Sequence, residues 1–135
     1  MSRYNTNLAS EFYVLSMLHR FGVDANLTLG NKKSVDIAVV RDTGNSITID
    51  VKGLAGKTSW PVDNVKEPKR GHYLVFVSYL GKISDPEVLP EVYVLPSSQV
   101  AKHTYLSPNG KRKVVQLSQL RKNAGRYKDA WHLIT

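Results

Sequence analysis

Residues 34–53 read SVDIAVVRDTGNSITIDVKG and carry the clearest structural signal in the chain. β-Branched residues alternate with other types over residues 34–41 and again over residues 46–53. This alternation predicts two β-strands, and the Asp-Thr-Gly-Asn between them is a turn signal. A three-residue loop over residues 42–44, with Gly44 in the left-handed conformation, sets Arg41 opposite Asn45.

That register places two carboxylates opposite one another. Asp36 lies across from Asp50, with Cβ atoms roughly 5 Å apart, and Lys52 follows Asp50 on the same face. Opposed carboxylates repel each other and destabilise a sheet unless a cation lies between them. The hairpin therefore predicts a cation beside these two residues.

The composition is that of a globular protein. We expect residues 1–135 to form a single domain, because this length suffices for one substantial core. Hydrophobic residues make up 41% of the chain and charged residues 22%, which are ordinary values. No apolar run approaches the ~20 residues of a membrane span, the N-terminus lacks a signal-peptide pattern, and a cytoplasmic location fits best. Cys is absent, which excludes disulfides, thiolate zinc sites and a cysteine nucleophile.

The net charge of +8 is unevenly distributed. Residues 1–55 hold six Lys or Arg and five Asp or Glu, whereas residues 56–135 hold thirteen and six. A basic half favours a polyanionic partner, nucleic acid first, and a solvated basic surface is the alternative. Trp60 either stacks on a base or anchors its loop. The residues predicted to contact nucleic acid are Lys32, Lys33, Lys57, Trp60, Lys69, Arg70, Lys111, Arg112 and Lys113.

Residues 7–21 predict an amphipathic helix that ends at Gly22. Glu11 falls inside its apolar stripe, where a carboxylate is costly unless something pairs with it. A Glu that bends out to water near the helix start is the alternative. The inward stripe is predicted to consist of Leu8, Phe12, Leu15 and Leu18.

The remaining pattern completes an α/β fold. Residues 72–80 form a near-continuous apolar run, as expected of a central strand that is covered on both faces. Shorter strands are predicted near residues 26–29, 91–95 and 113–116. Residues 53–71 read as a long basic loop, and helices are predicted near residues 97–105 and from Ser118. This order predicts a central mixed sheet flanked by helices.

The acidic residues favour metal-assisted chemistry on phosphates. Oxygen donors from Asp36, Asp50 and Glu11 suit Mg²⁺ or Mn²⁺, and zinc is disfavoured without Cys or paired His. Such an ion polarises a phosphoryl oxygen, while Lys52 orients water or offsets developing charge. With a basic surface to hold the phosphate backbone, phosphodiester hydrolysis is the simplest reaction class.

Asp36, followed fourteen residues later by Asp50-Val51-Lys52 and preceded by a helix with Glu11, resembles the PD-(D/E)XK nuclease superfamily. The small size and the Ser-Glu-Phe phrase look most like its archaeal-type Holliday-junction resolvases. The resemblance implies a restriction-endonuclease-like core of order αβββαβ and a Mg²⁺ cofactor that Mn²⁺ can replace. It implies Asp36, Asp50 and the Val51 carbonyl as metal ligands, Glu11 as a direct or water-mediated ligand, and Lys52 as the catalytic lysine.

Two departures from that pattern concern the motif itself. Val35 replaces the proline that names the motif, and Asp50 stands where resolvase-like members commonly have Glu. The shorter Asp50 side chain shifts or weakens a bound metal.

Three functional hypotheses follow. The first is a Mg²⁺-dependent DNA endonuclease that cuts branched or distorted DNA as a homodimer, with a restriction- or repair-like endonuclease as the variant within the class. The second is a catalytically silent nucleic-acid-binding module on the same fold. The third is a protein-interaction domain whose basic half binds an acidic protein.

Overall fold

The computed structural model describes residues 2–28, 36–41 and 44–135. Its longer elements are α1 (Arg3–Arg20), β1 (Ala25–Leu27), β2 (Ile37–Val40), β3 (Ser46–Leu54), β4 (Ser59–Pro61), β5 (His72–Ser78), β6 (Glu91–Pro96), α2 (Ser97–Val100), β7 (Thr104–Leu106), β8 (Lys113–Gln116) and α3 (Leu117–Asn123). Short 3₁₀ turns lie at Ala101–His103, Gly125–Tyr127 and Trp131–Leu133. In the part of the chain that is described, no helix has the length and apolar character needed to cross a membrane.

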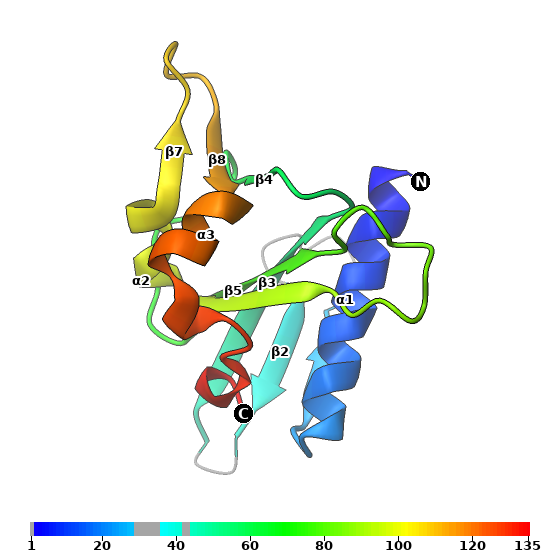
Figure 1. Cartoon of the computed structure of the whole chain (residues 1–135). Helices are drawn as coiled ribbons and strands as arrows, with labels where there is room; N and C mark the ends of the chain where they lie inside the picture. Colours follow the sequence, from blue (N-terminus) through cyan, green and yellow to red (C-terminus); the bar gives the residue numbers. More distant parts are fainter. Residues whose placement is uncertain (1, 29–35, 42–43) are drawn as a thin grey trace.

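The strands form two sheets. The larger has the order β1-β2-β3-β5-β6, in which β3 and β5 run parallel and the other pairs antiparallel. The smaller is antiparallel, with the order β4-β8-β7. Helix α1 covers one face of the large sheet, and α2, α3 and the small sheet lie toward the other (Figure 1). The predicted α/β class, a central mixed sheet flanked by helices, is confirmed.

The connection from β3 to β5 differs from the αβββαβ order. Residues 55–71 are described throughout, and they contain β4 and an extended loop where that order places a helix. This connection nevertheless places β5 parallel to β3. The paired residues run from Thr48 opposite His72 to Leu54 opposite Ser78. Strand β4 forms one edge of the small sheet.

Strand β5 is the central strand that the apolar run predicted. Val75 and Val77 face a core shared with α1, whereas Leu74 and Phe76 face a second core shared with α3 and Trp60. All four side chains have no exposed surface. Because both faces are covered, the strand reads as continuously apolar rather than alternating.

The β2–β3 hairpin has the predicted register. Ile37 pairs with Ile49 and Val39 with Ile47, which continues to Asp36 opposite Asp50. The Arg41 amide donates to the Asn45 carbonyl at 3.1 Å, and Gly44 has φ of +82°. Ser34, Val35 and loop residues 42 and 43 lie outside the described residues.

Helix α1 begins earlier than predicted and turns a different face inward. Ser2 caps it, its hydroxyl accepting from the Asn5 amide at 3.1 Å. The predicted stripe is wrong for Phe12, which is 53% exposed. The reason is a close approach to β3, where a Cβ at Gly53 would collide with the Ser10 hydroxyl. Small side chains must therefore line the contact, and the buried residues are Thr6, Ser10, Val14 and Leu18.

The free edge of β6 is covered by the segment after α3. The Asp129 amide donates to the Val92 carbonyl at 2.9 Å, and Lys128 forms a β-bridge with Tyr93. Asp129 takes a left-handed conformation, with φ of +50°, to make this contact. Trp131 and Ile134 then pack into the core beneath α1.

Candidate active site

A cleft of about 560 Å³ opens where β3 extends past the beginning of β2. Its walls come from the first half of α1, from β3, and from β4 with the turn that follows. The cleft brings together the five residues that the sequence singled out for chemistry. They are Glu11, Asp36, Asp50, Val51 and Lys52.

The two aspartates form a hydrogen-bonded pair. Asp36 accepts the Val51 amide at 2.7 Å through Oδ2, and its carboxyl also bonds to that of Asp50. Burial first, and then the hydrogen bond with Asp50, raise the pKa of Asp36 to about 7, against the opposing Val51 amide. Two carboxylates this close share a proton or a cation. The structure thus confirms the prediction that Asp36 and Asp50 lie opposite each other.

Lys52 and Glu11 complete the charged group. The Lys52 Nζ lies 3.3 Å from Oδ2 of Asp50. Burial raises the pKa of Glu11, and the negative charge of Asp50 adds to that rise. Glu11 thus lines the same cleft as the aspartates and lies near enough to Asp50 to feel its charge.

The carboxylates do not form a closed metal cage. Within the described residues, no group of three or more His, Asp or Glu side chains is arranged to hold a metal ion. Mg²⁺ is usually held by one or two carboxylates together with waters and substrate phosphates, and this donor set fits such an ion.

The Val51 carbonyl faces the same edge as these carboxylates. In a strand, the N–H and C=O of one residue point toward the same neighbouring strand. Because the Val51 amide donates to Asp36, its carbonyl also points toward the side of β3 where Asp36 lies. The Val51 carbonyl can therefore offer a third oxygen ligand beside those of Asp36 and Asp50.

Sequence reasoning missed several residues at the site. The cleft is also lined by Arg3, Tyr4 and Asn64, which the pattern of the motif did not indicate. His72 on β5 does not line the cleft but lies near enough to Asp50 to feel its charge; its Nδ1 is 2.8 Å from the Thr48 hydroxyl, and burial lowers its pKa although the charge of Asp50 opposes this. The parallel pairing of β3 with β5 is the signal that would have found His72.

The predicted nucleic-acid contacts divide into three groups. Trp60 is completely buried and its indole N–H donates to the Val77 carbonyl at 3.2 Å, so it anchors β4 and the stacking interpretation is wrong. Lys32 and Lys33 lie outside the described residues. The exposed group consists of Lys57, Lys69, Arg70, Lys111, Arg112 and Lys113.

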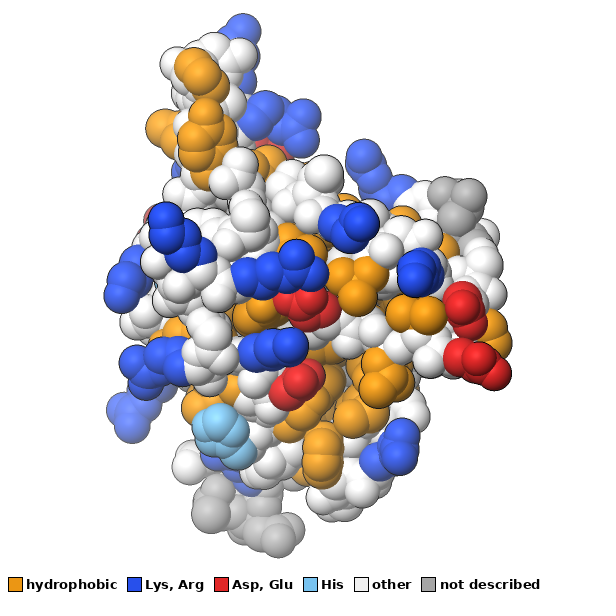
Figure 2. Space-filling view, in the orientation of Figure 1, with side chains coloured by type: hydrophobic (Ala, Val, Ile, Leu, Met, Phe, Trp, Pro, Cys, Tyr) orange, Lys and Arg blue, Asp and Glu red, His pale blue; other side chains and the backbone are white. Residues whose placement is uncertain are grey.

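Further basic side chains are exposed on and after α3. Figure 2 shows Lys and Arg gathered on the hairpin and over the helical side of the molecule. Arg121 bonds to Glu91 at 2.7 Å, which leaves the others as the freer charges. These additional exposed residues are Lys122, Arg126 and Lys128.

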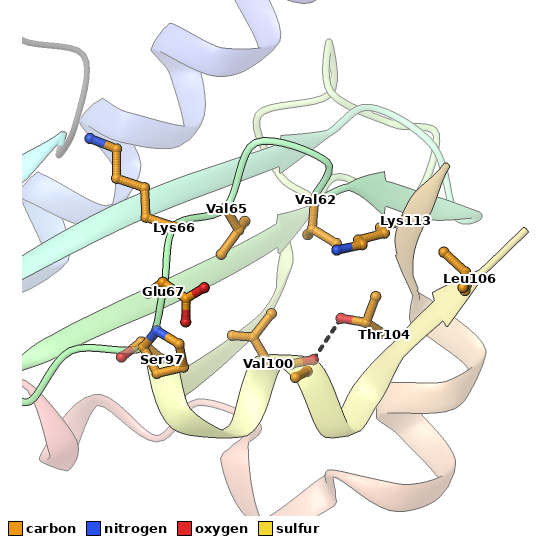
Figure 3. A pocket seen from close by; sticks show the side chains of 11 residues that line it. Val62, Val65, Lys66, Glu67, Ser97, Val100, Thr104, Leu106 and Lys113 are labelled. Atoms are coloured by element: carbon orange, nitrogen blue, oxygen red, sulfur yellow. Dashed lines mark hydrogen bonds between the residues drawn. The ribbon is translucent and has the colours of Figure 1, made fainter. Parts of the chain in front are cut away.

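A second groove, of about 400 Å³, lies between residues 62–68 and the α2–β7 segment (Figure 3). Val62, Val65 and Val100 give it an apolar lining, with Lys66 and Lys113 also in its wall. None of the five residues predicted for chemistry lines it. The first cleft is therefore the candidate active site.

Comparison with known proteins adds a likeness of fold. No family model matches the chain, and no curated protein matches it. The solved structure of a bacterial homing endonuclease, I-Ssp6803I, superposes with a TM-score of 0.65 at 20% sequence identity. The match covers 99% of this chain and 93% of that one. The chain thus shares the fold of a nuclease over almost its whole length.

Proposed function

We propose that the protein is a metal-dependent DNA endonuclease of the PD-(D/E)XK type. The observation that carries this is the strand register that pairs Asp36 with Asp50 in a cleft that Glu11 also lines, with Lys52 beside them. The likeness to a homing endonuclease supports it, because that protein is a nuclease on the same fold. The exposed basic residues supply contacts for a phosphate backbone.

Asp36, Asp50 and the Val51 carbonyl would hold Mg²⁺, or Mn²⁺ in its place. The ion supplies Lewis-acid polarisation of a phosphoryl oxygen and lowers the pKa of water. Glu11 lines the same cleft and would act as a direct or water-mediated ligand. The Val51 amide holds the Asp36 carboxylate in one orientation while the pair loses its shared proton.

Lys52 acts on the substrate. Its ammonium group has three N–H donors, and Asp50 engages one side of it at 3.3 Å. The remaining donors are available to a nonbridging phosphate oxygen or to the attacking water. Lys52 thereby stabilises charge that develops as the phosphodiester bond breaks.

Two substrates fit the class. Structure-directed cutting of a Holliday junction or other branched DNA, by a homodimer that addresses two strands, follows from the resolvase-like motif. Site-directed cutting of linear duplex is the second candidate, favoured by the extent of the match to a homing endonuclease. A restriction- or repair-like enzyme belongs to this second candidate.

A paired cleavage and calorimetry experiment tests the function. Wild type and Asp50→Asn are incubated with a four-way junction and a linear duplex in Mg²⁺, and Mn²⁺ is titrated into both proteins. We expect wild type to take up metal and cut, and Asp50→Asn to do neither. Glu87→Gln, an exposed carboxylate far along the chain from the motif, serves as the control.

The alternatives give different results. Tight, salt-sensitive DNA binding without metal uptake or cleavage by wild type would establish the silent binding module instead. Failure to bind any nucleic acid would favour the protein-interaction domain. Preference for the junction over the duplex decides between the two substrates.

A further inference from the structure

The β7–β8 hairpin stands clear of the body of the molecule (Figure 1). We call residues 104–116 the ribbon. At its root β4 pairs with Val114, Val115 and Gln116, and residues 62 and 63 continue beside the ribbon as far as Lys113; the turn at residues 107–112 projects beyond them. Pro61 of β4 also lines the active-site cleft, so ribbon and cleft share one strand.

The tip of the ribbon is tightly hydrogen-bonded. The Gly110 amide donates to the Ser107 carbonyl at 2.8 Å, and the Ser107 amide to the Arg112 carbonyl at 2.9 Å. The Asn109 side chain accepts from the Lys111 amide at 3.0 Å and from the Ser107 hydroxyl at 2.6 Å. A solvated loop needs none of these bonds, whereas a preformed recognition element loses less conformational entropy on binding.

The root is clamped as well. Asp63 accepts the Lys113 amide at 2.7 Å and lies 3.3 Å from Nε of Arg112. The Val62 amide donates to the Lys113 carbonyl at 2.9 Å. These bonds fix the direction in which the ribbon leaves β4, and hence its position relative to the cleft.

The surface of the ribbon combines charge with apolar groups. Lys111 and Lys113 are exposed, and Tyr105 and Leu106 are 48% and 53% exposed. Leu106 lies across from Lys113 in the last strand pair before the turn, and both are labelled in Figure 3. Lysine ammonium groups match phosphates at the rim of a DNA groove and guanine O6 and N7 inside the major groove, and apolar groups match thymine methyls there.

Size also selects the groove. Paired strands lie about 5 Å apart, so the ribbon fits the major groove, which is about 12 Å wide, whereas the minor groove is only about 6 Å wide. We infer that the ribbon enters the major groove of duplex DNA held at the cleft and fixes where the aspartate pair cuts. This inference rests on the proposed endonuclease function.

Methylation interference tests it without requiring cleavage. A linear duplex is selected from a random pool for tight binding and partially methylated at guanine N7, which lies in the major groove. In the absence of divalent metal, we expect methyl groups at a few adjacent positions to weaken wild-type binding about tenfold, a typical effect for one specific base contact. A variant in which Asn-Gly replaces residues 107–112 should lose this effect.

A charge variant covers the case in which the shortened ribbon does not fold. Lys111→Ala/Lys113→Ala keeps the turn and should both weaken binding and flatten the methylation profile. Arg20→Ala/Lys82→Ala removes the same charge from exposed sites elsewhere and should leave the profile unchanged. A profile that keeps its positions in Lys111→Ala/Lys113→Ala would reduce the ribbon to a backbone contact and overturn the inference.

The same samples separate the two proposals. If wild type shows the ribbon-dependent profile but does not cut in Mg²⁺, the proposed function fails while groove entry stands. If wild type cuts, and the shortened, folded ribbon gives the wild-type profile and cut positions, groove entry fails while the endonuclease stands.

Discussion

The two hairpins of this protein show opposite uses of the same local structure. The β2–β3 hairpin lies within the large sheet, buries one row of β-branched side chains and carries opposed carboxylates. The β7–β8 ribbon leaves its sheet, exposes its tip and carries cationic side chains. The first has a register fixed by burial, and the second has a geometry fixed by polar hydrogen bonds. Under the proposals made above, the packed hairpin would carry the chemistry and the projecting one would contact the DNA.

Lys52→Ala should give the largest effect, and it should distinguish the role of the β2–β3 hairpin in cleavage from that of the ribbon in DNA binding. Loss of its ammonium group removes charge stabilisation at the cleft, so we expect single-turnover cleavage to fall by about a thousandfold. DNA affinity without metal should change less than about threefold, because Lys52 is one cation among many. Lys82→Ala is the control, and normal cleavage by Lys52→Ala would refute the catalytic role.

Gly53→Ala tests the packing behind the first hairpin. The new Cβ would collide with the Ser10 hydroxyl and lie 3.0 Å from the Thr6 carbonyl. We expect a loss of about 2–3 kcal/mol of stability, measured as a melting temperature lowered by roughly 8 °C. Gly56→Ala, where nothing lies within 4 Å of the added Cβ, should shift the melting temperature far less. Equal shifts for both variants would argue against the close approach of α1.

Salt dependence tests the second hairpin. In Lys111→Ala/Lys113→Ala we expect the slope of log K against log salt to decrease in magnitude by about 2, since each phosphate contact contributes roughly 0.9. The affinity should fall about tenfold at low salt. An unchanged slope would mean that these lysines do not meet phosphates, whatever their effect on the methylation profile.

Asp36→Asn should give the smallest effect, and it should raise the melting temperature rather than lower it. The folded-state pKa of Asp36 is about 7, above its ordinary value of 3.8, so the metal-free protein loses stability as pH rises from about 4 through 7. An amide keeps the hydrogen bonds without the charge. We therefore expect a melting temperature about 3 °C higher than wild type at pH 8 without metal, and little difference at pH 5. Glu87→Gln should match wild type at both pH values.

The parts that the sequence predicted share one property, a buried alternating face. Ile37, Val39, Ile47 and Ile49 determine the β2–β3 register, because a slip of one residue would expose all of them. The carboxylate pair follows from that register. Lys52 follows as well, since residues two apart on a strand share a face.

The parts that sequence reasoning missed depend on contacts distant along the chain. The spacing of apolar residues predicts that Phe12 points inward. The buried face of α1 is instead determined by the close contact between Ser10 and Gly53 of β3. The sequence does not decide whether Trp60 stacks on a base or anchors its loop, because its hydrogen bond to Val77 joins two strands that are distant along the chain. His72 comes near Asp50 through the parallel pairing of β5 with β3.

The covering of β6 by the segment after α3 has a consequence for handling the protein. A bare outer strand offers unpaired amides and carbonyls to strands of other molecules and seeds aggregation. The contacts of Lys128 and Asp129 with β6 occupy part of that edge. Truncation before Lys128 would therefore lower solubility through intermolecular strand pairing, although neither Lys128 nor Asp129 lines the candidate active site.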